Sequence, residues 1–259
     1  VLFDVLQKYE IEEAFIFDIN EDLINAYIVI KNNVDDLVDY LSDLESIYLK
    51  LSIEERKKMY YNVREVYNSY ISINSQLNIE RAAQFIFLNK TCFNGLYRVN
   101  RAGFFNVPVG DYKNPTICDR NNLYAVSSLL KKVNIIIGDY RESIKYAEKQ
   151  SFVYFDPPYR PLNVTSNFTA YSKYDFTDED QVHLANFFSD MNETGALLML
   201  SNSDPKNENP DDNFFDDLYK NFFIHRIKAK RAINSNGSRR GLVSELLVTN
   251  YKVKSVEEL

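Results

Sequence analysis

Four consecutive residues, Asp156, Pro157, Pro158 and Tyr159, combine groups that can hold a planar amino group. They follow the apolar run FVYF, which is typical of a buried strand. A carboxylate and a backbone carbonyl can each accept an N–H hydrogen, and Pro157 offers its carbonyl without a competing N–H. The Tyr159 ring adds a flat face for stacking. Asp-Pro-Pro is also good turn chemistry, but ligands in open α/β sheets bind at this end of a strand, which favours a catalytic interpretation.

The exocyclic amino group of adenine is a substrate that suits these four residues. Its lone pair is delocalised into the ring, so the nitrogen is a poor nucleophile. Two acceptors that hold its hydrogens let the nitrogen pyramidalise and present its lone pair to a methyl donor. The atom cannot be reached inside a duplex, so the pattern predicts that the base is flipped out.

Length and composition limit the class of protein. The 259 residues suit one sizeable domain, with or without a smaller insertion. Two cysteines cannot make a disulfide framework, and two distant histidines make a zinc site improbable, so we expect no metal. Nothing resembles a signal peptide or an apolar run of about 18 residues. We therefore expect a reduced protein of the bacterial or phage-infected cytoplasm, away from the membrane.

The charge distribution favours a nucleic-acid partner although the net charge is −7. Two stretches hold basic residues and no acid, Asn89 to Gly110 and Asn221 to Ser244. Such a stretch is often only a solvated face, but two of them on an acidic protein suggest a phosphate-binding surface. The second stretch contains the following basic residues: Arg226, Lys228, Lys230, Arg231, Arg239 and Arg240.

Apolar periodicity predicts the elements that position these residues. The expected strands are Ala14–Asp18, Val133–Ile137, Phe152–Phe155, Ala196–Leu200, Phe223–Ile227 and Ser244–Asn250. The expected helices are residues 1–6, Glu21–Ile30, two or three within Asn33–Ser75, Ile79–Leu88, Arg141–Lys149, Asp178–Met191 and Phe214–Tyr219. The glycines and prolines of Asn94–Pro115 predict an ordered loop or small ribbon. The alternation predicts an α/β fold with a mostly parallel sheet and helices on both faces.

The chain resembles the Dam-type adenine methyltransferases of the alpha group over essentially its whole length. The segments that carry the resemblance are FIFDINEDLINAY (15–27), FNGLYRVN (93–100), FNVPVGDYKNP (105–115), GDY (138–140), FVYFDPPYRPL (152–162), TSNFTAY (165–171) and SELLVTNY (244–251). The resemblance implies S-adenosylmethionine as cofactor and double-stranded DNA, with the site GATC, as substrate. It implies a Rossmann-like catalytic domain of residues 1–32 and 128–259, with an inserted, mostly helical target-recognition domain of residues 33–127.

The same resemblance assigns the catalytic and cofactor residues. Asp156, Pro157, Pro158 and Tyr159 match the catalytic motif, and Asp156 also borders the cofactor. Asp18 matches the acid that holds the ribose hydroxyls of the cofactor, and a strand-ending carboxylate suits a diol. Asp139, with Tyr140, matches the position that binds the cofactor's adenine. For Asp18 and Asp139, the competing interpretation is an ordinary helix N-cap.

The DNA-binding assignments follow the matched loop and the basic stretch. The loop residues expected to contact bases or phosphates are Arg98, Asn100, Arg101, Pro108, Tyr112 and Lys113. Arginine suits guanine and asparagine suits adenine in the major groove. Arg231, Arg239 and Arg240 are expected to contact phosphates, and Thr165–Tyr171 is expected to fold over the active site.

The chain departs from the family at its beginning. The family places a strand and a glycine-rich loop before the first helix, whereas the first glycine here is Gly95. That strand would lie in the middle of the sheet, so we expect the 259 residues to be part of a longer chain.

Two alternatives stay open from the residues. One is methylation of another amino group, of cytosine or of an RNA adenine. The other is a catalytically inactive DNA-binding relative. A restriction endonuclease of the same specificity is expected as a functional rather than a physical partner.

Overall fold

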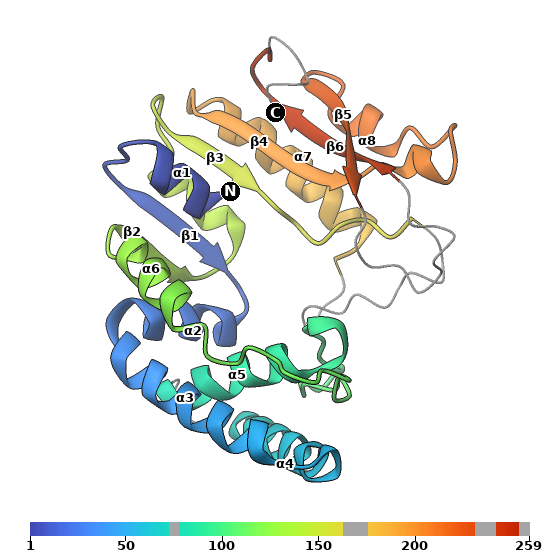
Figure 1. Ribbon diagram of the computed structural model, residues 1–259. Helices are drawn as coiled ribbons and strands as arrows, with labels where there is room; N and C mark the ends of the chain where they lie inside the picture. The colour runs from blue at the N-terminus through green and yellow to red at the C-terminus, as the bar shows by residue number, and fades with distance from the viewer. Residues whose placement is uncertain (73–77, 163–175, 231–241, 254–259) are drawn as a thin grey trace. The chain divides into compact units, whose positions relative to one another are not determined.

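The computed structural model describes residues 1–72, 78–162, 176–230 and 242–253, which fall into two compact units (Figure 1). The first unit ends at Ser143 and the second begins at Ile144. No helix within the described ranges is both long and apolar enough to cross a membrane.

The elements of each unit follow the chain in order. The first unit contains α1 (Leu2–Lys8), β1 (Ala14–Asp18), α2 (Glu21–Asn32), α3 (Val34–Lys50), α4 (Ile53–Ser72), α5 (Ile79–Thr91), the short 3-10 helix η1 (Phe93–Gly95), α6 (Arg120–Leu130) and β2 (Val133–Ile137). The 3-10 helix η2 (Tyr140–Tyr146) leads into the second unit. The second unit contains β3 (Phe152–Phe155), α7 (Asp178–Asn192), β4 (Leu197–Ser203), the 3-10 helix η4 (Pro205–Asn207), α8 (Phe214–Leu218), β5 (Phe223–Lys230) and β6 (Leu242–Thr249).

Two parallel strands bring distant acids to one edge of the first unit. β1 and β2 pair in parallel from Ala14 opposite Val133 to Asp18 opposite Ile137. The Gly138 N–H extends this pairing by donating to the Asp18 carbonyl oxygen over 3.1 Å. Parallel strands end at the same edge, so Asp18 and Asp139 leave the sheet as neighbours.

One face of α4 holds the Asn94–Pro115 region in place. Its side chains Tyr60, Arg64 and Asn68 are four residues apart, so they lie along one face of the helix. The Tyr60 hydroxyl and the Arg64 guanidinium donate to the Val107 carbonyl oxygen, over 2.8 and 3.1 Å. Asn68 exchanges two hydrogen bonds with the backbone of Phe105, of 2.8 and 3.1 Å. These side chains thereby satisfy backbone groups of Phe105 and Val107 in the extended segment.

The extended segment is a narrow ribbon, as its glycines and prolines predict. Antiparallel bridges join Cys92 to Val109 and Val99 to Phe105. Gly110 donates to the Thr91 carbonyl oxygen over 2.8 Å, and a Cβ there would lie 2.7 Å from the carbonyl oxygen of Cys92. Only glycine allows this close approach to the end of α5.

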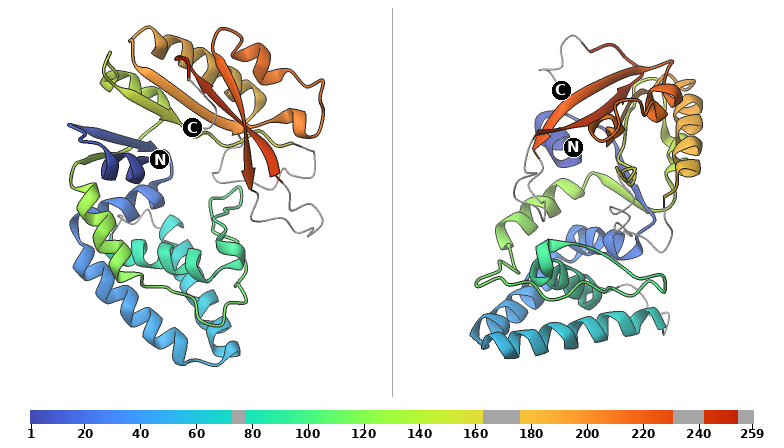
Figure 2. Two further views of the ribbon diagram at one scale, coloured as in Figure 1. Left: turned by 45° about the horizontal axis from the view of Figure 1, so that its top comes forward. Right: turned by 90° about the vertical axis from the view of Figure 1, so that its right-hand side faces the viewer.

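The second unit is built on a four-stranded sheet of order β3-β4-β6-β5. β3 and β4 are parallel, whereas β6 is antiparallel to both β4 and β5. α7 covers one face of this sheet (Figure 2), where Phe155 contacts Phe187 and Phe188 with ring centroids 6.1 and 5.7 Å apart. Buried aromatic residues therefore fix the strand that precedes Asp156.

Two expectations about the fold are corrected. The helix expected at Arg141–Lys149 is the 3-10 helix η2, which begins at Tyr140 and ends at Tyr146. The described strands form two parallel and two antiparallel pairs in two sheets, a mixed α/β arrangement rather than a mostly parallel sheet. The division into residues 33–127 and the rest stays a prediction.

Candidate functional site

The loop Asp156–Tyr159 starts at the carboxyl end of β3 and is held by the neighbouring strand β4. Phe155 lies opposite Leu200 in the parallel register, so the next residue of β4, Ser201, faces Asp156. The Ser201 hydroxyl donates to Oδ1 of Asp156 over 3.0 Å. The same hydroxyl lies 2.9 Å from the hydroxyl of Tyr154. One side of the Asp156 carboxylate is therefore fixed by a buried serine.

Buried amides fix the rest of the loop. The Arg160 N–H donates to the Asn202 side chain over 3.0 Å, and Gln181 donates to the Pro158 carbonyl oxygen over 3.0 Å. Asn202 and Gln181 also hydrogen-bond to each other over 3.1 Å. Both amides are almost fully buried. A satisfied buried network of this kind specifies a single loop conformation.

Arg160 anchors the loop to two further segments. Its guanidinium forms ion pairs of 2.8 Å with Asp178, at the first turn of α7, and with Asp212. It also lies 4.3 Å from the ring centroid of Phe214. The hydrogen bond from Arg160 is the main reason that the pKa of Asp212 is lowered. The three contacts hold the chain directly after Tyr159.

Tyr159 is accessible at the surface of this loop. Its side chain is 36% exposed. Partial burial, opposed by a hydrogen bond from Ser201 and supported by the nearby charge of Asp156, raises the pKa of Tyr159 to about 12. The ring is therefore neutral over the working range of pH and can offer a stacking face.

Asp18 and Asp139 form a second set of strand-end acids, in the first unit. Oδ1 of Asp18 accepts the Asn20 N–H over 2.7 Å, and burial raises the pKa of Asp18 above its ordinary value of 3.8. Asp139 is ion-paired with Arg141 at 2.7 Å and accepts the Arg141 N–H over 2.9 Å. Burial raises the pKa of Asp139, but the bonds and charge of Arg141 outweigh it and lower that pKa. The N-cap interpretation is wrong for Asp18, because Asn20 is the residue that caps α2, whereas Asp139 accepts a backbone N–H at the start of η2.

The predicted DNA-binding residues of the ribbon differ in their surroundings. Arg98 is tied to Asn106 by a hydrogen bond of 2.8 Å from its Nε. The Asn100 side-chain oxygen accepts the N–H groups of Ala102 and Phe104 over 3.0 Å, so this residue closes the ribbon's turn. Arg101 is exposed at that turn. The predicted base contacts of Arg98, Asn100 and Arg101 stay predictions.

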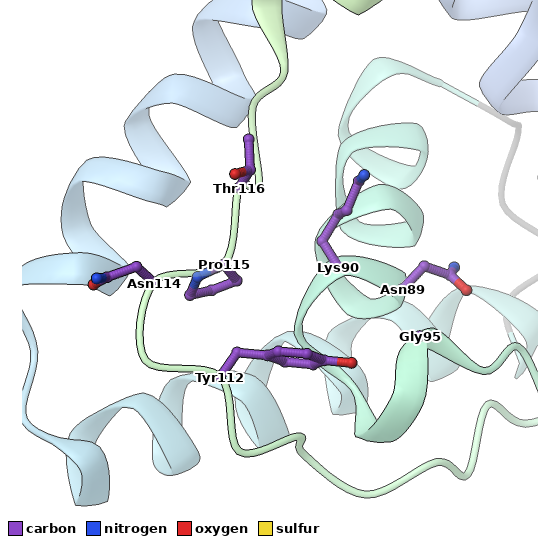
Figure 3. A pocket seen from close by; sticks show the side chains of 7 residues that line it. All are labelled: Asn89, Lys90, Gly95, Tyr112, Asn114, Pro115 and Thr116. Carbon is purple, nitrogen blue, oxygen red and sulfur yellow. The ribbon is translucent and has the colours of Figure 1, made fainter. Parts of the chain in front are cut away.

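An open pocket of about 570 Å³ lies beside the ribbon, between the end of α5 and the chain after Gly110 (Figure 3). Figure 3 shows Tyr112 pointing toward the turn at Gly95 and Asn114 pointing away from it. Pro108 and Lys113, which are close to Tyr112 in the sequence, are both exposed. The carbonyl oxygen of Lys113 accepts a hydrogen bond of 2.7 Å from the Arg56 guanidinium. The pocket is lined by Asn89, Lys90, Gly95, Tyr112, Asn114, Pro115 and Thr116.

Other predicted residues lie outside the described ranges or have a different role. Arg231, Arg239, Arg240 and the segment 165–171 lie outside the described residues. Arg226, which the basic stretch includes, forms ion pairs with Asp204 at 3.1 Å and Asp216 at 2.8 Å, so it is engaged within the protein. Within the described part of the chain, no group of three or more His, Cys, Asp or Glu side chains could hold a metal ion.

The residues of β4 that hold the loop are not among those predicted from the sequence. Ser201, Asn202 and Ser203 are buried polar residues directly after the apolar run LLML. Ser203 donates to the Arg160 carbonyl oxygen over 2.6 Å. A polar run that follows a buried strand was the available signal, because the ends of adjacent parallel strands share an edge.

The chain matches the family described as D12 class N6 adenine-specific DNA methyltransferase over residues 1–233. It is 53% identical over 252 residues to the type II methyltransferase M.MjaIII of Methanocaldococcus jannaschii, covering 97% of this chain and 84% of that protein.

Two further relatives support the same conclusion. The type II methyltransferase M1.LlaDCHI of Lactococcus lactis subsp. cremoris is 38% identical over 93% of this chain and 80% of its own length. The DNA adenine methylase of Escherichia coli strain K12 is 35% identical over 89% of this chain and 76% of its own length. The chain therefore belongs to the D12 class N6 adenine-specific DNA methyltransferase family, and it is an enzyme of that family.

Proposed function

We propose that the protein transfers a methyl group from S-adenosylmethionine to N6 of a flipped adenine in a short duplex site. The observation that carries the proposal is the loop Asp156–Tyr159 at the end of β3, held by Ser201, Asn202 and Gln181. A preorganised acceptor works better than one that must be ordered during the reaction. The buried contacts of this loop supply that preorganisation.

Asp156 and Pro157 supply the two acceptors for the adenine amino group. The Pro158 carbonyl oxygen is already engaged by Gln181, so the Pro157 carbonyl is the backbone acceptor of choice. With both hydrogens held, the N6 lone pair would be directed at the electrophilic methyl group that a bound S-adenosylmethionine would supply. The Asp156 carboxylate would take up the N6 proton that the new N–C bond displaces and would pass it to water. Tyr159 stacks on the flipped base throughout.

Asp18 and Asp139 suit the nucleoside part of the cofactor. A carboxylate can accept both hydroxyls of a ribose, and Asp18 keeps one oxygen beyond its bond to Asn20. Asp139 and Tyr140 follow at the end of the adjacent strand, where an acceptor and an aromatic ring suit adenine. When bound, the cofactor supplies an electrophilic methyl group. The donor set, two carboxylates on neighbouring strand ends, fits this group.

We further propose that residues 33–127 form an inserted, mostly helical target-recognition domain on a Rossmann-like methyltransferase sheet. The ribbon held by α4 is its DNA-reading part, with Arg98, Asn100, Arg101, Tyr112 and Lys113 toward the duplex. GATC is the proposed site, from the resemblance to Dam-type enzymes. We place the protein in the cytoplasm of a bacterium, an archaeon or a phage-infected cell, where a restriction endonuclease of the same specificity is its functional partner.

A product assay tests this proposal. The protein is incubated with S-adenosylmethionine carrying a deuterated methyl group and with duplexes that contain GATC or single-base variants of it. Digestion to nucleosides and mass spectrometry then identify the methylated base. We expect deuterated N6-methyladenine from GATC and much less from each variant. Methylated cytosine, or equal methylation of every duplex, contradicts the corresponding part of the proposal.

A further inference from the structure

One face of α4 follows the ribbon and the chain directly after it. Residues at every fourth position of this helix share the face, and they donate to backbone carbonyl oxygens of the ribbon. Arg56 donates to Lys113 over 2.7 Å. Tyr60 and Arg64 both donate to Val107, over 2.8 and 3.1 Å. A single helix therefore sets the course of the chain that is proposed to read DNA.

Asn68 is the next residue of this series, and it both donates to the ribbon and accepts from it. Its side-chain nitrogen donates to the Phe105 carbonyl oxygen over 3.1 Å, and its side-chain oxygen accepts the Phe105 N–H over 2.8 Å. One side chain thus pairs both backbone groups of one residue, as a neighbouring strand does. Asn68 takes the place of a strand at this edge of the ribbon.

Phe105 lies in the ribbon between two candidate DNA-reading residues. Its antiparallel bridge with Val99 is flanked by two backbone hydrogen bonds. The Asn100 N–H donates to the residue before Phe105 over 2.9 Å, and the residue after Phe105 donates to the Arg98 carbonyl oxygen over 3.1 Å. In a pair of this kind the backbone groups of Phe105 point to the outer edge, where Asn68 meets them.

The side chains of the ribbon alternate between a buried face and an accessible one. Val99 and Phe105 are 5% and 1% exposed, and the Phe105 ring packs edge-on against that of Tyr67, in α4, at 6.2 Å. Arg98 and Asn100 flank Val99, so their side chains extend to the other face. Asn100 is exposed and Arg98 is half-buried. The face of the ribbon that carries these two residues is the one that α4 leaves accessible.

The strand that Asn68 holds also orients the Arg98 side chain. Asn106, the neighbour of Phe105, accepts a hydrogen bond of 2.8 Å from Nε of Arg98. A shift of this strand therefore moves both the backbone and the guanidinium of Arg98. A shift of about 1 Å is enough to lose a hydrogen bond to a base, since N–H···O distances span only about 2.7–3.2 Å.

We propose that Asn68 is a positioning residue for target recognition, because it fixes Phe105 and thereby the places of Arg98 and Asn100 against the bases. Its amide is engaged with Phe105, so it acts through the ribbon rather than by touching DNA. Its loss lowers discrimination between sequences and leaves the sequence-independent attraction to phosphates in place. This inference rests on the proposed function, which assigns DNA reading to the ribbon.

The experiment measures discrimination as the ratio of kcat/KM for GATC to kcat/KM for each duplex with one base pair changed. A good bidentate base contact contributes roughly fivefold to a hundredfold discrimination. For Asn68→Ala, which removes both hydrogen bonds, we expect the ratio to fall about fivefold or more for at least one position of the site. The affinity for a non-target duplex, its salt dependence and the affinity for S-adenosylhomocysteine should stay nearly unchanged.

Two further variants keep the test free of a general effect on folding. Asn62→Ala is the matched control, since it removes the same amide from an exposed position on another face of α4, and it should keep the full ratio. Asn68→Asp has nearly the size of asparagine and keeps the acceptor for the Phe105 N–H, but it has no donor for the Phe105 carbonyl oxygen. It should lower the ratio as well. All rates are measured well below the lowest melting temperature of the set.

The outcomes separate the two proposals. If the unmodified protein methylates no duplex, or methylates GATC and its variants equally, the proposed function or its site fails, and this inference fails with it. If the unmodified protein discriminates and a folded Asn68→Ala or Asn68→Asp keeps the full ratio, the inference alone is overturned. An equal loss in Asn62→Ala overturns it too. Equal weakening on target and non-target duplexes, with a smaller salt slope, would make Asn68 a phosphate contact and overturn the positioning role.

Discussion

Ser201→Ala should slow methyl transfer while leaving both substrates bound. The Ser201 hydroxyl is the described group that donates to the Asp156 carboxylate, at 3.0 Å. A hydrogen bond to a charged group contributes about 1.5–3 kcal/mol. Asp156 is exposed, so water replaces part of the loss and the lower end of that range applies. About 1.5 kcal/mol lost from the transition state corresponds to roughly a tenfold slower chemical step.

Single-turnover kinetics is the suitable assay, because product release does not affect it. Excess enzyme with a labelled methyl donor and a GATC duplex gives the rate of the chemical step directly. Ser203→Ala is the matched control, as it is equally buried on the same strand but donates to the Arg160 carbonyl oxygen. We expect it to lower the melting temperature with a smaller effect on the chemical step. A Ser201→Ala rate equal to that of the unmodified protein would refute the positioning of Asp156 by β4.

The remaining predictions concern the other parts of the proposed site. Burial raises the pKa of Asp18 above 3.8, so its carboxylate is lost on acidification at a higher pH than usual. Calorimetry should therefore show that the affinity for the cofactor falls as the pH drops through a value above 3.8. Asp18→Asn should bind the cofactor weakly at every pH, without this fall. Arg98→Ala or Arg101→Ala should reduce the difference in affinity between GATC and non-target duplexes, measured in a salt titration. If either variant weakens binding equally to the two kinds of duplex, that arginine contacts phosphates rather than bases. Tyr159→Ala should weaken capture of the flipped base by about 1–3 kcal/mol, measured as target-duplex affinity, and Tyr159→Phe should restore it; failure of Phe to restore it would contradict stacking.

The positions of several strands could be predicted because a short apolar run that ends in polar residues is typical of a buried strand. Ala14–Asp18, Val133–Ile137 and Phe152–Phe155 lie where the sequence places them. β4 extends further, through Ser203, because its polar end pairs with β6 and forms side-chain bonds to the loop after β3. Those partners are some 40 residues away in the chain, which local periodicity does not register.

Two regions differ from the sequence prediction, in each case because of contacts that form only in the folded chain. The region after Asp139 forms a 3-10 helix, closed at its start by Asp139 and Arg141. Arg226 belongs to an acid-free stretch of sequence, yet Asp204 and Asp216 neutralise it in the folded chain. Charge along a sequence therefore overstates the free positive surface, because ion pairs form between elements that only the fold brings together.

The motif Asp156–Tyr159 could be found from sequence because its chemistry lies in consecutive residues. The groups that make it rigid are harder to find, since Ser201, Asn202 and Gln181 come from two other elements, and the only sequence signal for the first two is a polar run after the apolar residues of β4. Register and packing decide these contacts.

The most direct test of the account is methyl transfer by Asp156→Ala under single-turnover conditions, with binding measured on the same preparation. Asp156 acts on the target amino group, so the variant should bind S-adenosylhomocysteine and the GATC duplex with nearly the affinities of the unmodified protein. It should form no detectable N6-methyladenine while the unmodified protein converts the duplex. Turnover near that of the unmodified protein would contradict the assignment of Asp156–Tyr159 as the site of adenine methylation.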